Sequence, residues 1–201
     1  KWYINFEKKY IINANSKKRI HLTGDEVEKL IINNPRLWWP NGYGEQNLYN
    51  LEVITSDAKG LPDYKKIRFG IRELEYELAV NTQENEVRRI NLNPLEAYRS
   101  GHEIIDRINR KSISHGQFVP QILCGLDYSG INVVEGNHPY IVFKVNGRRI
   151  FCKGGNWGMD DAMKRLNKED LRKYFELHKG QHFNMIRNWT GESTQSSFYE
   201  L

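Results

Sequence analysis

The fold is decided by residues 141–189, which read IVFKVNGRRIFCKGGNWGMDDAMKRLNKEDLRKYFELHKGQHFNMIRNW. At the start of this stretch, two β-branched and aromatic runs, 141–145 and 148–153, flank the pair Asn146-Gly147. An Asn-Gly pair between two such runs favours the positive φ angles of a type I′ turn. The stretch therefore predicts a β-hairpin.

A helix is predicted farther along the chain, from about Lys168 to Lys179. Asn167 suits its N-cap, acidic residues follow in the first turn, and Gly180 suits its end. Apolar and aromatic residues recur at i, i+3, i+4 and i+7, which is typical of a helix with one buried face. These residues are Leu171, Tyr174, Phe175 and His178.

Short extended runs precede and follow this helix. We expect the extended run 148–153 to supply the first strand and Phe183 to Arg187 to form the second. A strand, a helix and a strand within about forty residues form a βαβ unit, whose parallel strands need both faces covered. Because the chain ends at Leu201, we expect it to hold only the beginning of an α/β barrel. Such a barrel has its chemistry at the carboxyl ends of its strands.

The sequence before position 78 has the pattern of an all-β segment. Short runs bounded by Asn, Gly, Pro and Asp recur at the spacing of a β-sandwich. The predicted fold class is therefore mainly β, a sandwich followed by the first βαβ part of a barrel. The expected sandwich strands are Tyr10 to Ala14, Arg19 to Leu22, Glu28 to Ile32, Leu48 to Thr55 and Ile67 to Leu78.

Residues 81–137 do not continue this spacing of short strand-like runs and are interpreted as an insertion. A stretch beginning at Pro94 has roughly helical spacing, although Gly101 weakens it. The remainder is rich in Gly, Asn and Ser and is expected to be irregular, and the sequence assigns it no function. The apolar positions of the helical stretch are Leu95, Tyr98, Ile105 and Ile108.

Charge and hydropathy argue against two classes of partner. The 201 residues include 30 Lys and Arg against 25 Asp and Glu, a net charge of +5. The basic residues are interleaved with acidic ones rather than gathered in a stripe, so we expect no nucleic-acid binding. No apolar run approaches the roughly eighteen residues of a membrane span, so none is predicted.

The cysteine and histidine spacings predict no metal site. Cys124 and Cys152 have no Cys or His partners at zinc spacing, so free thiols are the default interpretation, with a disulfide if the protein is exported. His178 and His182 are four residues apart but lack the Glu of a zinc-protease helix. A periplasmic or secreted location is favoured over the cytoplasm, although the compartment stays open.

Aromatic residues are concentrated in a turn bounded by Pro and Gly. Trp38, Trp39 and Tyr43 would suit a platform on which sugar rings stack. Aromatic residues beside Pro in a sandwich more often fill a core or a domain junction. We favour the structural role and keep carbohydrate stacking as the alternative.

Four segments together resemble glycoside hydrolase family 2, in its β-mannosidase and exo-β-glucosaminidase branch. Each segment is weak alone, but the four occur in the order expected of that family. They are LWWPNGYGEQNLYNLEV at 37–53, RFGIRELE at 68–75, FKVNGRRIFCKGGNW at 143–157 and FNMIRNWTGESTQSSFYEL at 183–201.

The resemblance implies an architecture and a reaction. It places an immunoglobulin-like sandwich at 1–140, with the insertion at 81–137, and a linking hairpin plus the start of a truncated (β/α)8 barrel at 141–201. The first barrel strand would lie near Ile150 to Lys153. A further domain would precede Lys1. The implied parent is a retaining exo-β-glycosidase acting on a carbohydrate, first a β-mannoside, then a β-glucosaminide or β-galactoside. That chemistry needs no cofactor and no metal.

By the same resemblance, this chain contributes no catalytic residue. A retaining glycosidase uses two carboxyl groups about 5 Å apart, and in the family both are Glu on later barrel strands. They would lie beyond Leu201, so the chain alone is expected to be inactive. The alternative is a non-catalytic carbohydrate-binding or structural sandwich module, and the sequence does not predict the oligomeric state.

The candidate residues are therefore substrate-binding ones. The stretch GGNWGMDDA resembles a family motif whose Trp and Asp line the sugar pocket. It implies Trp157 and Asp161 as substrate-binding residues, with Asn156 of the same motif as a further candidate. The motif NMIRNW implies Arg187 in the active site and Trp189 as a second wall of the sugar pocket. Arg187 ends an apolar run, where a buried charge would be costly unpaired, so we expect it to have a carboxylate partner. The competing role for Trp157 is to fill the hydrophobic core at the mouth of the barrel. Departures from the family motifs after Trp157 and Trp189 affect the expected substrate more than the reaction class.

Overall fold

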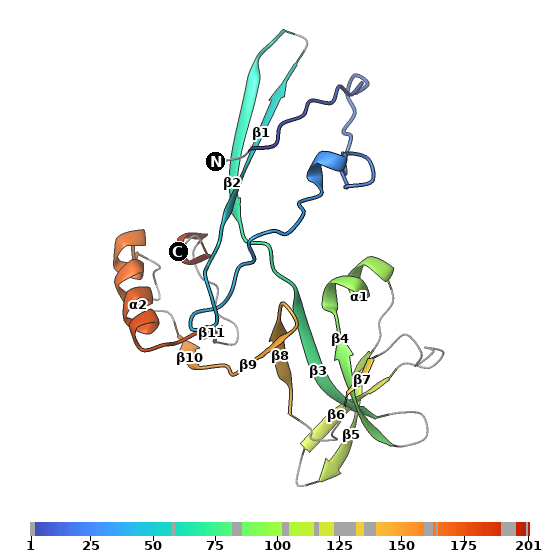
Figure 1. Ribbon diagram of the computed structural model, residues 1–201, viewed down its shortest axis with the longest axis vertical. Helices are drawn as coiled ribbons and strands as arrows, with labels where there is room; N and C mark the ends of the chain where they lie inside the picture. Colours follow the sequence, from blue (N-terminus) through green and yellow to red (C-terminus); the bar gives the residue numbers. More distant parts are fainter. Residues whose placement is uncertain are drawn as a thin grey trace. The chain divides into compact units, whose positions relative to one another are not determined.

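The structure, a computed structural model, is mainly β (Figure 1). It divides into two units, Lys1–Arg36 and Leu37–Leu201. The described residues are 3–57, 59–81, 86–101, 105–114, 117–122, 132–134, 140–158, 163, 165–189, 196–199 and 201.

Where the structure describes it, the first unit is extended chain with turns and a single short 3-10 helix, η1 (Glu28–Leu30). The strands expected at Tyr10–Ala14, Arg19–Leu22 and Glu28–Ile32 are wrong, because no strand occurs among this unit's described residues. Their β-branched residues suit a pleated surface, but a strand also needs a neighbour for its backbone N–H and C=O groups. Among the residues described from 3 to 36, only Val27 is buried.

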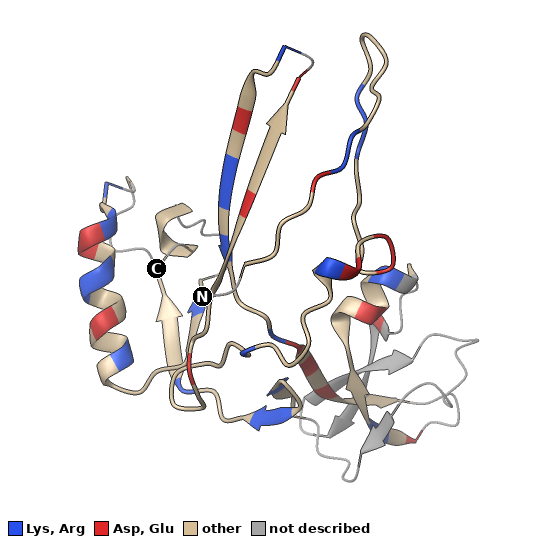
Figure 2. Ribbon diagram, turned by 45° about the horizontal axis from the view of Figure 1, so that its top comes forward, with Lys and Arg blue, Asp and Glu red and all other residues tan. Residues whose placement is uncertain are grey.

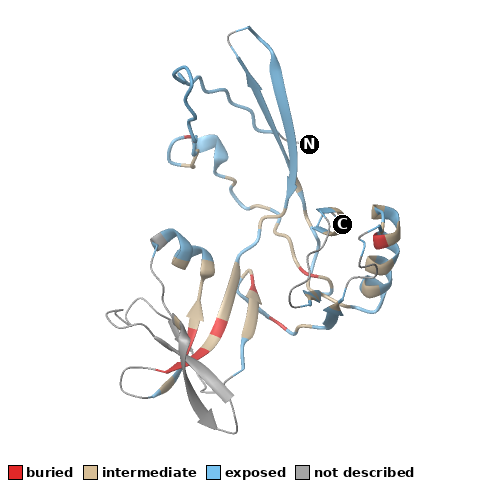
Figure 3. Ribbon diagram, turned by 180° about the vertical axis from the view of Figure 1, so that it is seen from behind, coloured by how far each residue is buried: buried red, intermediate tan, exposed pale blue. Residues whose placement is uncertain are grey.

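The second unit begins with a long antiparallel hairpin of β1 (Tyr49–Ser56) and β2 (Pro62–Phe69). β1 confirms the strand expected at Leu48 to Thr55. The strand expected from Ile67 to Leu78 is wrong in extent, because the chain leaves β2 at Gly70. A Cβ on Gly70 would lie 2.8 Å from Cβ of Trp38, so only glycine lets the backbone pass there. The hairpin is exposed almost throughout (Figure 3).

A seven-stranded sheet forms the main core of this unit. Its strand order is β5-β6-β3-β4-β7, and β8 and β9 extend it from β3 (Figure 1). The strands are β3 (Leu74–Asn81), β4 (Val87–Leu92), β5 (Ile105–Ser114), β6 (Gln117–Ile122), β7 (Asn132–Val134), β8 (Val142–Val145) and β9 (Arg148–Ile150).

The predictions for this region meet different outcomes. The β8–β9 hairpin is confirmed, with Asn146 at φ 51° and Gly147 at φ 76° in its turn. The helix expected from Pro94 is present as α1 (Pro94–Ser100), but it is shorter than the expected stretch. The expectation of irregular chain in the remainder of 81–137 is wrong for the described residues of β4 to β7. That helix starts at the N-cap Asn93 and stops at Gly101, whose φ is 69°. The left-handed glycine ends the helix, so the positions from Ile105 lie in a strand instead.

The sheet has an apolar and a charged face, because side chains alternate along each strand. Val80, Ile90, Val145 and Ile150 are buried on the apolar face. On the other face Glu77 and Arg89 pair while both are only 3% exposed. Arg149 binds the second oxygen of Glu77 at 2.9 Å. A buried carboxylate needs such partners, so both guanidinium groups help to hold the sheet together.

The predicted strand–helix–strand segment is present as β10 (Gly154–Trp157), α2 (Lys168–Gly180) and β11 (Met185–Asn188). The two strands are parallel neighbours. The first strand expected at Ile150–Lys153 is wrong, because Ile150 belongs to the β8–β9 hairpin, opposite Phe143. At Gly154 an added Cβ would overlap the Met185 carbonyl, so β10 starts where glycine allows close approach.

The helix α2 forms where the sequence predicts it. The Asn167 side chain accepts a hydrogen bond from the Asp170 N–H at 3.0 Å, and Leu171 is buried. Basic and acidic residues both recur along this helix (Figure 2). A short helix, α3 (Ser196–Tyr199), follows β11. Within the described part of the chain, no helix is both long and apolar enough to cross a membrane.

Candidate functional site

The β10–β11 strand pair has two different faces. Neighbouring residues of a strand point to opposite sides, and residues in register lie on the same side. Asn156 is in register with Arg187, and Trp157 with Asn188. One face therefore presents Asn156 and Arg187, and the other presents Trp157 and Asn188.

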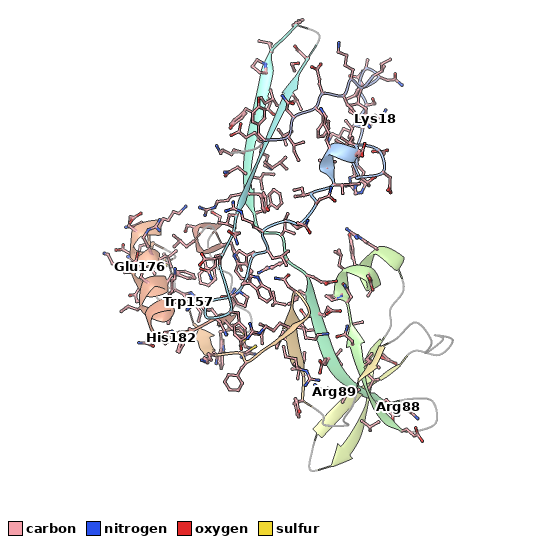
Figure 4. All side chains as sticks on the ribbon, viewed as in Figure 1. Lys18, Arg88, Arg89, Trp157, Glu176 and His182 are labelled. Carbon is pink, nitrogen blue, oxygen red and sulfur yellow. The ribbon has the colours of Figure 1, made fainter. Side chains whose placement is uncertain are left out.

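The Trp157 face is covered by helices. The Trp157 ring lies 5.7 Å from that of Tyr174 and 6.5 Å from that of His178, both on α2. It also lies 5.6 Å from the ring of Phe198 on α3. Figure 4 shows Trp157 beside α2. The side chain expected to line a sugar pocket thus packs in an aromatic cluster between strand and helices.

The opposite face is open and contains three of the expected residues. Arg187 Nη1 donates to Asn156 Oδ1 at 3.0 Å, and the Arg187 guanidinium lies 5.8 Å from the centre of the Trp189 ring. All three residues are exposed. The structure therefore brings together Asn156, Arg187 and Trp189, each from the carboxyl end of a strand or directly after it.

The hydrogen bonding of Arg187 differs from the expectation in one respect. A carboxylate partner was expected because a buried arginine would be costly unpaired. Arg187 is instead exposed, and its partner among the described residues is the amide oxygen of Asn156. A guanidinium has five N–H donors, and no described residue accepts a hydrogen bond from the rest. Such a group can bind hydroxyl or carboxylate oxygens of a ligand.

Several predicted residues lie outside the described part of the chain. Asp161 is one, so its relation to Arg187 is not described, and Cys124 is another. Cys152 is a half-buried free thiol, and burial raises its pKa. Within the described ranges, no group of three or more His, Cys, Asp or Glu side chains could hold a metal ion.

Asn184, which no sequence motif singled out, joins the segments that lead into β10 and β11. Its Oδ1 accepts from the Lys153 N–H at 2.9 Å, and its Nδ2 donates to the Phe151 carbonyl at 3.0 Å. Its only signal in the sequence is a polar residue inside the apolar run FNMI. That signal does not distinguish a side chain that bonds the backbone from one that faces solvent.

The aromatic turn near position 40 is engaged in contacts within its own unit. The Arg72 guanidinium lies 4.6 Å from the centre of the Trp38 ring, and that of Arg148 lies 5.2 Å from the centre of the Tyr43 ring. A Cβ on Gly44 would lie 2.8 Å from the Trp39 ring. These contacts favour the structural role over a free stacking platform.

A family comparison matches Glycosyl hydrolases family 2 at residues 4–72. Over 164 residues the chain is 30% identical to the mannosylglycoprotein endo-β-mannosidase of Lilium longiflorum, a match that covers 81% of this chain and 11% of that protein.

Fungal proteins match as well. Identity is 26% over 171 residues with β-mannosidase B of Emericella nidulans, covering 84% of this chain and 14% of that protein. With β-mannosidase A of Aspergillus clavatus it is 22% over 196 residues, covering 95% and 16%. The chain thus spans well under a fifth of the length of these relatives. No solved structure matches it.

Proposed function

Because this chain belongs to glycosyl hydrolases family 2, in its β-mannosidase-like branch, we propose that it is part of a retaining exo-β-glycosidase. The preferred substrate is a β-mannoside, followed by a β-glucosaminide or a β-galactoside. The names of its relatives support the sugar, and the proposal covers the protein of which this chain is a part.

In this proposal the β10–α2–β11 segment begins the (β/α)8 barrel, and residues 1–140 belong to an immunoglobulin-like sandwich with an insertion at 81–137. A parallel strand pair with a helix on one face and open on the other supports the barrel assignment. The helix side would face outward and the open side would face the barrel axis. The antiparallel sheets are compatible with a sandwich.

The observation that supports the proposal most strongly is the Asn156–Arg187 pair on the open face, with Trp189 beside it. Barrel active sites lie at the carboxyl ends of the strands, where these residues are. Arg187 would donate hydrogen bonds to sugar hydroxyls, and Trp189 would offer its ring to the apolar side of a pyranose. Asp161 would accept hydrogen bonds from the sugar. Trp157 would stabilise β10 by packing against α2 and α3 on the opposite face of the strand pair.

The reaction would proceed through a covalent glycosyl-enzyme formed on one carboxylate, while a second carboxyl group acts first as acid and then as base. Both groups are assigned to the part of the barrel that follows this chain. Arg187 would stabilise the charged form of a nearby carboxylate and so lower its pKa. The chain alone is expected to be inactive.

Product stereochemistry tests the proposed mechanism directly. In the intact enzyme, ¹H NMR during hydrolysis of an aryl β-mannoside should show β-mannose as the first product, since two inversions give net retention. A 2-deoxy-2-fluoro-β-mannoside should label one Glu beyond position 201. If α-mannose appears first, the retaining mechanism is wrong.

The lily relative gives a reason for a second candidate, cleavage in endo fashion within a mannosylglycoprotein glycan. The intact enzyme should be compared on an aryl β-mannoside and on a mannosylglycopeptide. Faster release of mannose from the aryl glycoside supports exo action. Release of an intact oligosaccharide from the glycopeptide would instead assign endo action.

A further inference from the structure

The turn Pro40–Tyr43 contacts both strands of the candidate site at their beginnings. It is closed by the Tyr43 N–H, which donates to the Pro40 carbonyl at 3.1 Å, and Gly42 adopts φ 82°. That angle suits the third position of a type II turn. Asn41 and Tyr43 are thereby held at a fixed spacing, with both side chains available to other segments.

Asn41 binds the segment that leads into β11. Its Nδ2 donates to the carbonyl of Lys179 at 3.1 Å and to that of Phe183 at 3.0 Å. The first carbonyl is in the last turn of α2, and the second is two residues before β11 begins. One side-chain amide therefore fixes where the chain turns from helix to strand.

Tyr43 binds the segment that leads into β10. Its hydroxyl accepts a hydrogen bond from the Phe151 N–H at 2.8 Å. Asn184 then joins this segment to the β11 side, through Lys153 N–H and the Phe151 carbonyl. The hydrogen bonds close a ring that runs from the turn to β11, across to β10 and back to the turn.

We propose that the turn Pro40–Tyr43 is a positioning element for the sugar site, because it fixes the starting points of β10 and β11. Asn156 lies three residues after Lys153, and Arg187 three residues after Asn184. A slip of either strand by one residue moves its side chains to the other face. The ring therefore determines that Asn156 and Arg187 meet on the open face. This inference rests on the proposed function.

The test uses the intact enzyme and the substitution Asn41→Asp, which keeps the shape of the side chain but replaces its N–H donors with a carboxylate facing two carbonyls. The matched control is Asn50→Asp, at an exposed position on β1. The first readout is hydrogen exchange of the Asn184, Met185 and Trp189 amides, which donate to Lys153 and Trp157 carbonyls. We expect exchange about tenfold faster or more in Asn41→Asp, and unchanged in the control.

The second readout is a double-mutant cycle with Arg187→Lys, measured as kcat/KM on an aryl β-mannoside. Asn41→Asp should lower kcat/KM by about tenfold to a hundredfold in the wild-type background. In the Arg187→Lys background it should have little further effect, because both changes act on the same group. Equal losses in the two backgrounds, or unchanged exchange, would overturn the inference.

A milder variant and the exchange readout keep the two proposals separable. If Asn41→Asp does not fold, Tyr43→Phe removes only the acceptor for Phe151 N–H, with Tyr98→Phe on α1 as its control. Its expected effects have the same direction and are smaller, and their absence counts against the positioning role. A wild-type enzyme that hydrolyses no β-glycoside refutes the proposed function, whereas the exchange result still decides whether the turn fixes the two strands.

Discussion

Arg187 and Asn156 are register partners on parallel strands, joined by a 3.0 Å hydrogen bond from Nη1 to Oδ1. The bond lies on the face of the strand pair opposite the aromatic cluster of Trp157. A guanidinium held from one side keeps its remaining donors in a defined plane. The relationship therefore gives this face a fixed hydrogen-bonding group for a polar ligand.

Arg187→Lys in the intact enzyme should lower kcat/KM on a β-mannoside by about tenfold or more, because an ammonium cannot reproduce the planar fork. The control is Arg99→Lys at the exposed end of α1, which should leave kcat/KM unchanged. Steady-state kinetics measure both. Equal activity of Arg187→Lys and wild type would remove Arg187 from the site.

Gly154→Ala should disrupt the start of the strand pair, because its Cβ would overlap the Met185 carbonyl. We expect the free energy of unfolding of the 201-residue chain to fall by about 1–3 kcal/mol. Gly155→Ala is a close control, since no atom lies within 4 Å of its Cβ position. Urea unfolding of both variants measures the difference, and equal midpoints would contradict the observed register.

Glu77 should make the stability of the chain depend on acid pH. Burial alone would raise its pKa, but hydrogen bonds and charges from Arg149 and Arg89 outweigh burial and hold the pKa below its ordinary value. A lowered folded-state pKa means that this stabilisation is complete above the unfolded-state pKa and is lost as pH falls through the folded-state value.

The test is Glu77→Gln, which removes the titrating group. At neutral pH this variant should be less stable by about 3–5 kcal/mol, because Arg89 stays buried without its carboxylate. Below about pH 4 its stability should change less with pH than that of wild type. Glu96→Gln on α1, which is exposed, should keep the wild-type profile. Parallel acid profiles for Glu77→Gln and wild type would contradict the ion-pair account.

Leu171 and Leu177 allow a comparison on a single helix. Leu171 is 1% exposed and Leu177 is 62% exposed. Leu171→Ala should cost about 2–5 kcal/mol through lost burial and a cavity, whereas Leu177→Ala should change stability by less than about 0.5 kcal/mol. Thermal or urea unfolding of the chain measures both. A similar cost at the two positions would mean that α2 packs on another face.

The elements that were predicted well depend on neighbours in sequence. The β8–β9 turn follows from Asn146-Gly147, whose positive φ angles are an intrinsic preference. The helix α2 follows from its cap at Asn167 and its apolar spacing. Both signals lie within a few residues of the structure that they specify, so one sequence is enough to read them.

The elements that were missed depend on distant partners. The sequence from Ile105 continues the helical spacing of α1, but Gly101 ends that helix. Ile105–Ser114 instead forms a strand by pairing with β6. The expected strands before Arg36 have suitable residues but no described pairing. Local propensity does not report which segment a strand will meet.

The candidate site shows the same division. The motifs identified Asn156, Arg187 and Trp189, and the structure brings these three together. The side on which Trp157 lies depends on the starting position of β10, which was expected at Ile150 and is found at Gly154. A shift of the strand by one residue moves each side chain to the other face. The observed start of β10 depends on the close approach of Gly154 to Met185, which the family motif does not report.

The most direct test is hydrolysis of para-nitrophenyl β-mannoside, β-glucosaminide and β-galactoside by the intact enzyme beside the 201-residue chain. We predict turnover by the intact enzyme, with the highest kcat/KM on the β-mannoside, and none by the chain alone. Turnover by the chain alone would contradict the assignment of both catalytic carboxylates to the later barrel. No turnover of any of the three substrates by the intact enzyme would contradict the proposed function.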